Sequence, residues 1–108
     1  MSSVETVVTD AELHEVVANN SVVVVDFSAP GWCVPCRRLA PHFESAAQRL
    51  AGVKFVEVDI DKSESIRKAY DIMSVPYLVA FKEGDVVGEV KGRTALALVA
   101  EIQAIANS

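Results

Sequence analysis

The chain has 108 residues, a hydrophobic content of 51% and a net charge of −5. This length suits one folded domain with a real core, and residues 1–108 are expected to form it. The longest apolar run, residues 22–25, is too short to cross a membrane, and the few adjacent basic residues make nucleic acid an unexpected partner.

The first half of the chain predicts two strands and two helices. Thr9 and Glu12 form a capping-box pattern, in which each side chain bonds the backbone amide of the other residue. Four consecutive valines then indicate a strand buried on both faces of a sheet. The predicted order is a strand at residues 5–8, a helix to about 18, a strand at 21–27 and a helix from 33 or 34 to about 50.

The second half predicts three more strands and two helices. Gly84 lies in a tight turn, residues 82–85, which indicates a hairpin. The alternation of strands and helices predicts the α/β class, with a central mixed sheet and helices on both faces. The predicted elements are a strand at 53–59, a helix at 63–69, strands at 77–82 and 86–91, and a helix at 94–106.

Cys33 and Cys36 are the two cysteines of the chain and are separated by Val34 and Pro35. Such a pair favours redox or metal chemistry. Zinc needs four ligands, and the remaining histidines, His14 and His42, lie on different predicted helices, so zinc is disfavoured. Two inert core cysteines are the other alternative.

Position favours the redox interpretation of this pair. Cys33 is expected where a strand ends and a helix begins, and the free amides of a helix N-terminus stabilise a thiolate there, which lowers its pKa. Cys36 is one turn further along and is expected to be more buried. Cys33 is therefore the predicted nucleophile and Cys36 the predicted resolving thiol.

Several segments in the same order resemble the thioredoxin family over nearly the whole chain. Residues 25–37, Val-Asp-Phe-Ser-Ala-Pro-Gly-Trp-Cys-Val-Pro-Cys-Arg, are similar to the family's active-site segment. Further matches are Pro41, residues 56–61, residues 74–78, residues 81–84 and Gly92. The resemblance implies a thioredoxin fold, with a five-stranded mixed sheet flanked by four helices. It also implies a protein disulfide reductase that needs no bound cofactor beyond a redox-active Cys33–Cys36 disulfide.

The resemblance assigns Asp26 a place behind the cysteines. Burial disfavours the charged form of a carboxylate, so the pKa of Asp26 is expected to rise, and Asp26 becomes a base for Cys36 through a water. Glu57 stands where some family members carry lysine, and its charge would raise this pKa further. The alternative is an exposed carboxylate at the strand end.

The resemblance also implies a docking surface for client proteins. Pro76 is expected to be cis and to turn the backbone of Val75 toward the cysteines, where it pairs with an extended client strand. The alternative is a trans proline that starts the next strand. The expected client-binding residues are Trp32, Val34, Pro35, Val75, Pro76 and Gly92.

Departures from the family pattern fall on this surface. Val34 stands where the family usually has glycine, and the segment of residues 29–31 is one residue longer than usual before Trp32. Ser28 and Tyr77 also replace common family residues. Val34 is expected to alter either substrate preference or redox potential, and the changes together predict an altered choice of partners with unchanged exchange chemistry.

The expected partners are a thioredoxin reductase, which supplies electrons, and disulfide-containing client proteins. A cytoplasmic location is expected, because no export signal is visible. An organelle is the alternative if a transit peptide was removed. The protein is expected to be a monomer. The apolar last helix, with Leu96, leaves a weak dimer open. Two other functions are alternatives: a periplasmic thiol oxidoreductase of cytochrome maturation, and a non-catalytic interaction subunit.

Overall fold

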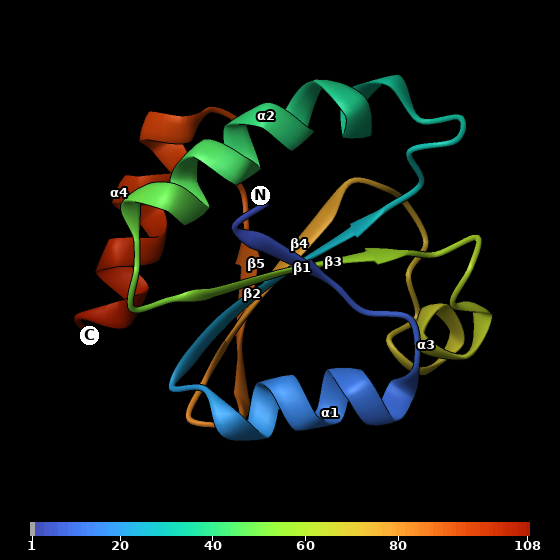
Figure 1. The fold of residues 1–108 in the computed structure, drawn as a ribbon, viewed down its shortest axis with the longest axis horizontal. Helices are drawn as coiled ribbons and strands as arrows, with labels where there is room; N and C mark the ends of the chain where they lie inside the picture. Colours follow the sequence, from blue (N-terminus) through green and yellow to red (C-terminus); the bar gives the residue numbers. More distant parts are fainter. Residues whose placement is uncertain (1) are drawn as a thin grey trace.

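The computed structural model describes residues 2–108, and its five strands form one mixed sheet (Figure 1). The strand order is β1-β3-β2-β4-β5. β3 runs parallel to β1 and β2, whereas β4 runs antiparallel to β2 and β5. The strands are β1 (Val4–Thr6), β2 (Val22–Ser28), β3 (Lys54–Asp59), β4 (Tyr77–Lys82) and β5 (Asp85–Val90).

Four helices cover the two faces of this sheet. In Figure 1, α1 and α3 lie on one side and α2 and α4 on the other. The predicted α/β class, with five strands and four helices, is confirmed. The helices are α1 (Asp10–Asn19), α2 (Val34–Arg49), α3 (Glu64–Ala69) and α4 (Ala95–Ala106).

β2 is the central strand, and all seven of its residues are buried. Val23 and Val25 belong to one hydrophobic cluster, whereas Val24 belongs to the cluster that includes residues of α2 and α4. The interpretation of the valine run is thus confirmed, because alternate side chains of a strand enter opposite layers. The same alternation sends Asp26, two residues after Val24, toward the α2 side.

Local signals define several element ends. Thr9 accepts from the amide of Glu12, whose carboxylate accepts from the amide of Thr9, so the capping box is confirmed. Glu83 and Gly84 have φ of 52° and 85° and form a two-residue hairpin turn. The first strand is shorter at its end than predicted, because the carbonyl of Val8 accepts from the Ser63 hydroxyl at 2.7 Å instead of pairing within the sheet.

Candidate active site

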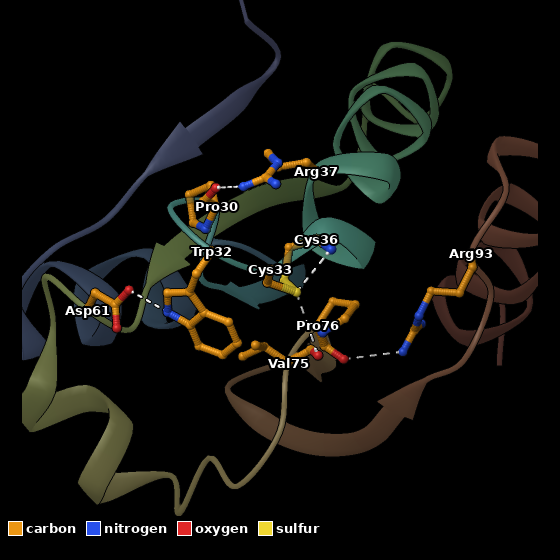
Figure 2. Close-up of a disulfide and its surroundings, with 9 residues drawn as sticks. All are labelled: Pro30, Trp32, Cys33, Cys36, Arg37, Asp61, Val75, Pro76 and Arg93. Atoms are coloured by element: carbon orange, nitrogen blue, oxygen red, sulfur yellow. Dashed lines mark hydrogen bonds between the residues drawn. A yellow bond between two sulfur atoms is a disulfide. The ribbon is translucent and has the colours of Figure 1, made fainter.

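Cys33 and Cys36 form a disulfide at the start of α2 (Figure 2). Cys33 is the N-cap of this helix, and its Sγ accepts a hydrogen bond from the amide of Cys36 at 3.1 Å. The Cα atoms are 5.2 Å apart. Pro35 lies in the first turn, where its missing amide hydrogen costs no helical bond. The helix therefore directs a backbone donor at Cys33.

Burial does not separate the two cysteines. Cys33 is 4% exposed and Cys36 is 2% exposed. Their surroundings differ more, because Cys33 Sγ also lies 3.8 Å from the carbonyl oxygen of Val75, on the loop opposite the disulfide. Position at the helix end, rather than exposure, therefore distinguishes their chemistry.

Asp26 lies near the end of β2 and is 1% exposed. Its Oδ1 has no hydrogen-bond partner among residues 2–108. The pKa of Asp26 is raised from 3.8 to about 7, first by burial and then by the Glu57 carboxylate, whereas the Arg93 guanidinium lowers it. The predicted burial of Asp26 is confirmed, whereas its role as a base and the effect of Glu57 on its titration remain predictions.

Asp26 and Glu57 share one hollow beside α2. They are register partners on the parallel strands β2 and β3, so their side chains leave the same face of the sheet. The hollow measures about 220 Å³, and Glu44 of α2 also lines it. The pKa of half-buried Glu57 is raised as well, first by burial and then by Asp59. We call this space, with Asp26, Glu44 and Glu57, the acidic hollow.

The loop before β4 lies opposite the disulfide. The Val75–Pro76 peptide bond is cis, as predicted. Figure 2 shows both residues beside the two sulfur atoms, with the Arg93 side chain reaching toward Pro76. Val75 and Pro76 are half-buried, so this loop is partly open to solvent.

Trp32 and Val34 are exposed beside the disulfide, by 61% and 44%. The indole Nε1 of Trp32 donates to Oδ2 of Asp61 at 2.9 Å, which orients the ring (Figure 2). Asp61 was not singled out in the sequence, because no local pattern connects it to a residue 29 positions earlier. Trp32 also lines, with Val75, a cleft of about 330 Å³.

Gly92 follows β5 and packs closely against the start of α4. A Cβ atom there would lie 3.0 Å from the backbone carbon of Ala97 and from the nitrogen of Leu98. The amide of Gly92 also donates to Glu101 at 2.8 Å. Close approach to the helix therefore explains glycine here, and contact of Gly92 with clients remains a prediction.

The longer segment before Trp32 closes into a compact turn. The carbonyl of Ala29 accepts from the amides of Trp32 and Cys33 at 3.2 and 2.9 Å. The Arg37 guanidinium donates to the carbonyl of Pro30 at 2.8 Å (Figure 2). The extra residue is thus held by bonds within the active-site segment.

The described chain shows neither a metal-binding group nor a membrane-spanning helix. Within residues 2–108, no three His, Cys, Asp or Glu side chains gather in a group that could hold a metal ion. His42 instead accepts from the amide of Ala95 at the start of α4. None of the helices described here has the length and apolar content needed to cross a membrane.

Comparison with known proteins identifies the family. The thioredoxin family model matches residues 4–104. The chain belongs to the thioredoxin family. It is 44% identical over 92 residues to thioredoxin 1 of Synechococcus elongatus, covering 83% of this chain and 85% of that one.

Solved structures agree with this membership. The oxidised mitochondrial thioredoxin 3 of Saccharomyces cerevisiae has a TM-score of 0.84 at 30% identity, covering 94% of this chain and 95% of that one. A structure of the thiol resolving mechanism in yeast mitochondrial 1-Cys peroxiredoxin via glutathione/thioredoxin systems contains a chain with a TM-score of 0.85. That chain is 29% identical, with 96% and 99% coverage. The predicted thioredoxin fold is confirmed.

Family membership and the disulfide together establish the chemistry of this thioredoxin-family chain. Cys33 and Cys36 stand at the spacing of the family's redox-active pair. The chain is a thiol–disulfide oxidoreductase of the disulfide-reductase kind. Val34, one of the departures noted above, lies between the two cysteines and leaves their spacing unchanged.

Proposed function

We propose that Cys33 is the nucleophile and Cys36 the resolving thiol in the reduction of client disulfides. The observation that carries this assignment is the hydrogen bond from the Cys36 amide to Cys33 Sγ at the N-terminus of α2. In the reduced protein, the same donor and the helix dipole stabilise a thiolate on Cys33. Cys36, inside the first turn, has no equivalent position.

The exchange moves two electrons to the client. The Cys33 thiolate attacks one client sulfur, the client S–S bond breaks, and the first client thiolate leaves and takes up a proton. Cys36 then loses its proton and attacks Cys33 Sγ in the mixed disulfide. The second client thiol departs, and the Cys33–Cys36 disulfide remains.

Asp26 is proposed as the base that receives the Cys36 proton, through a water. Its pKa of about 7 supports this role, because a base works best when its pKa lies near the working pH. The unpartnered Oδ1 also leaves an acceptor free for that water. A carboxylate with an ordinary pKa would accept the proton less readily.

Clients are proposed to dock across Trp32, Val34, Pro35, Val75, Pro76 and Gly92. The exposed Trp32 and Val34 support an apolar contact, and the Val75 backbone beside Cys33 supports pairing with an extended client strand. Such a backbone-directed surface suits protein disulfides rather than one small molecule.

A thioredoxin reductase is proposed to return the oxidised pair to the dithiol, since no nucleotide-binding glycine loop is visible. The similar chain from the peroxiredoxin structure supports protein clients. A reducing compartment such as the cytoplasm is proposed, because thiols are kept reduced there. We also propose that residues 1–108 act as one domain and a monomer, although Leu96 is 74% exposed and offers a dimer contact.

The test is reductase-coupled reduction of a protein disulfide by wild type, Cys33→Ser and Cys36→Ser. Cys33→Ser is expected to be inactive, and Cys36→Ser to accumulate a mixed disulfide visible by mass spectrometry. Accumulation in Cys33→Ser instead would reverse the assignment. An inactive wild type would contradict the reductase.

A further inference from the structure

A second hollow borders the docking surface on the other side of α2. It measures about 300 Å³. Its described lining includes Arg38, His42 and Arg93 and contains no carboxylate, although the chain as a whole carries −5. Pro35, Leu39 and Pro76 complete it. We call these six residues the basic cleft.

The basic cleft continues directly from the disulfide. Pro35 lies between the two cysteines, and Pro76 follows Val75, whose carbonyl is 3.8 Å from Cys33 Sγ. A client strand paired with the Val75 backbone therefore passes the cleft with residues close to its own cysteine. A side chain there can reach the cleft without leaving the docking surface.

The two arginines of the cleft keep unneutralised charge. Within residues 2–108 the ion pairs are Lys54–Glu5 and Lys68–Glu64, and neither involves Arg38 or Arg93. Arg93 donates to the carbonyls of Val90, Gly92 and Pro76 at 3.0, 2.9 and 3.5 Å (the last is drawn in Figure 2). These acceptors are neutral, so they orient the guanidinium and leave its positive charge available.

His42 adds a neutral donor to the same wall. Its Nδ1 accepts from the amide of Ala95 at 3.1 Å, so the neutral ring carries its proton on Nε2. Arg93 has five N–H donors, and three hydrogen bonds occupy three of them in the described chain. The cleft therefore offers several donors beside two positive charges, which suits a carboxylate.

We propose that the basic cleft binds an aspartate or glutamate next to the client cysteine, so that the protein prefers disulfides with acidic neighbours. This inference rests on the proposed function. The ligand is a carboxylate of the client polypeptide itself. Arg38 and Arg93 supply the charge, and Pro35 and Pro76 place the cleft beside the reacting sulfur.

The charge of the whole protein makes this preference depend on position. A net charge of −5 repels acidic clients at long range. A glutamate that reaches the cleft gains a short-range contact, whereas a distant glutamate meets only the repulsion. Acidic residues are thus favoured beside the client cysteine and disfavoured further away.

The experiment measures the rate constant for reduction of three synthetic peptide disulfides by the reduced protein. One peptide has Glu beside the cysteine, the second has Gln there, and the third carries the same Glu far from the cysteine. At low salt the first is expected to react about threefold faster than the second, the range of an exposed Arg–carboxylate pair. The third is expected to react no faster than the second.

Arg38→Gln is expected to bring the Glu-to-Gln rate ratio close to one. Arg49→Gln is the matched control, because Arg49 is exposed on the same helix and lies outside the cleft. It is expected to keep the wild-type ratio.

Three results would overturn the inference. They are a wild-type ratio of one, an unchanged ratio in Arg38→Gln, and equal rates for the near and distant Glu peptides. Failure to reduce even the Gln peptide would overturn the proposed function, and this inference with it, whereas reduction without preference would remove the inference alone.

Discussion

Helix α2 separates two hollows of opposite charge. On one side the acidic hollow contains Asp26, Glu44 and Glu57, and on the other the basic cleft contains Arg38, His42 and Arg93. Residues three and four apart share a helix face, so Arg38 and His42 lie together while Glu44 falls on the opposite side. Helix α2 thus lines both the hollow that holds the proposed base and the cleft that borders the proposed docking surface.

Asp26 experiences both regions at once. The Glu57 carboxylate raises its pKa, and the Arg93 guanidinium lowers it. Burial remains the largest cause, so the pKa stays near 7. In the proposed function, proton transfer and client choice use separate side chains, and the charge of Arg93 couples them through the pKa of Asp26.

Replacement of Asp26 should produce the largest change, and it alters the acidic hollow. A pKa raised from 3.8 to about 7 means that the folded protein binds a proton more tightly than the unfolded chain. The free energy of unfolding therefore falls as the pH rises from about 4 to about 7, by about 4 kcal/mol in total. Asp26→Asn should be more stable than wild type by up to about this amount at pH 8, measured by urea unfolding.

The pH dependence is the control for this prediction. The stability difference between Asp26→Asn and wild type should shrink as the pH falls toward 4, and a difference independent of pH would contradict it. The same variant should resolve the mixed disulfide about 100-fold more slowly. Its preference for acidic over neutral peptides should persist, because the basic cleft is intact.

Gly92→Ala tests the other region and should have an intermediate effect. The added methyl group meets backbone atoms of α4 at 3.0 Å, so the segment that carries Arg93 must shift. A destabilisation of about 1–3 kcal/mol is expected, measured by thermal or urea unfolding, together with a reduced preference for the Glu peptide.

Gly52→Ala is the matched control, because a Cβ there meets nothing within 4 Å. Its free energy of unfolding should stay within about 0.5 kcal/mol of wild type. Equal stability of the two variants would show that the close approach at Gly92 relaxes without cost.

Glu57→Gln should have the smallest effect, and it tests how far the charge of Glu57 contributes to the pKa of Asp26. The variant removes one charge that raises the pKa of Asp26 and leaves the burial that is the larger cause. The pKa of Asp26, followed by carbon-13 NMR, should fall below about 7 and remain well above 3.8. An unchanged pKa of Asp26 would show that Glu57 is screened from it. Glu44→Gln removes a different charge of the same hollow, so the pKa of Asp26 in that variant can be compared with its pKa in Glu57→Gln.

Local sequence patterns predicted much of this molecule. The Thr9–Glu12 capping box, the valine run of β2 and the turn at Gly84 each encode a neighbouring backbone geometry, so they could be recognised without the fold. The Cys33–Cys36 spacing likewise allowed the redox pair to be recognised from the sequence. The cis bond before Pro76 was different, because family resemblance rather than local sequence predicted it.

Long-range pairings could not be predicted in this way. Trp32 and Asp61 are 29 residues apart, and the Arg38 and Arg93 of the basic cleft come from separate elements. Neither pair has a spacing that marks it in the chain. The packing reason for Gly92 likewise depends on where α4 lies.

Sequence alone was sufficient for the elements and for the chemistry of Cys33 and Cys36, because hydrophobic periodicity, capping and short spacing act between near neighbours. The surroundings of Asp26 and of Pro76 could be known only from the sheet order and the helix packing. They bring Glu57 beside Asp26 and Arg93 beside Pro76, and burial and charge at those contacts adjust the pKa of Asp26 and the surface that meets clients. Such effects depend on distance in space, which a linear sequence does not contain.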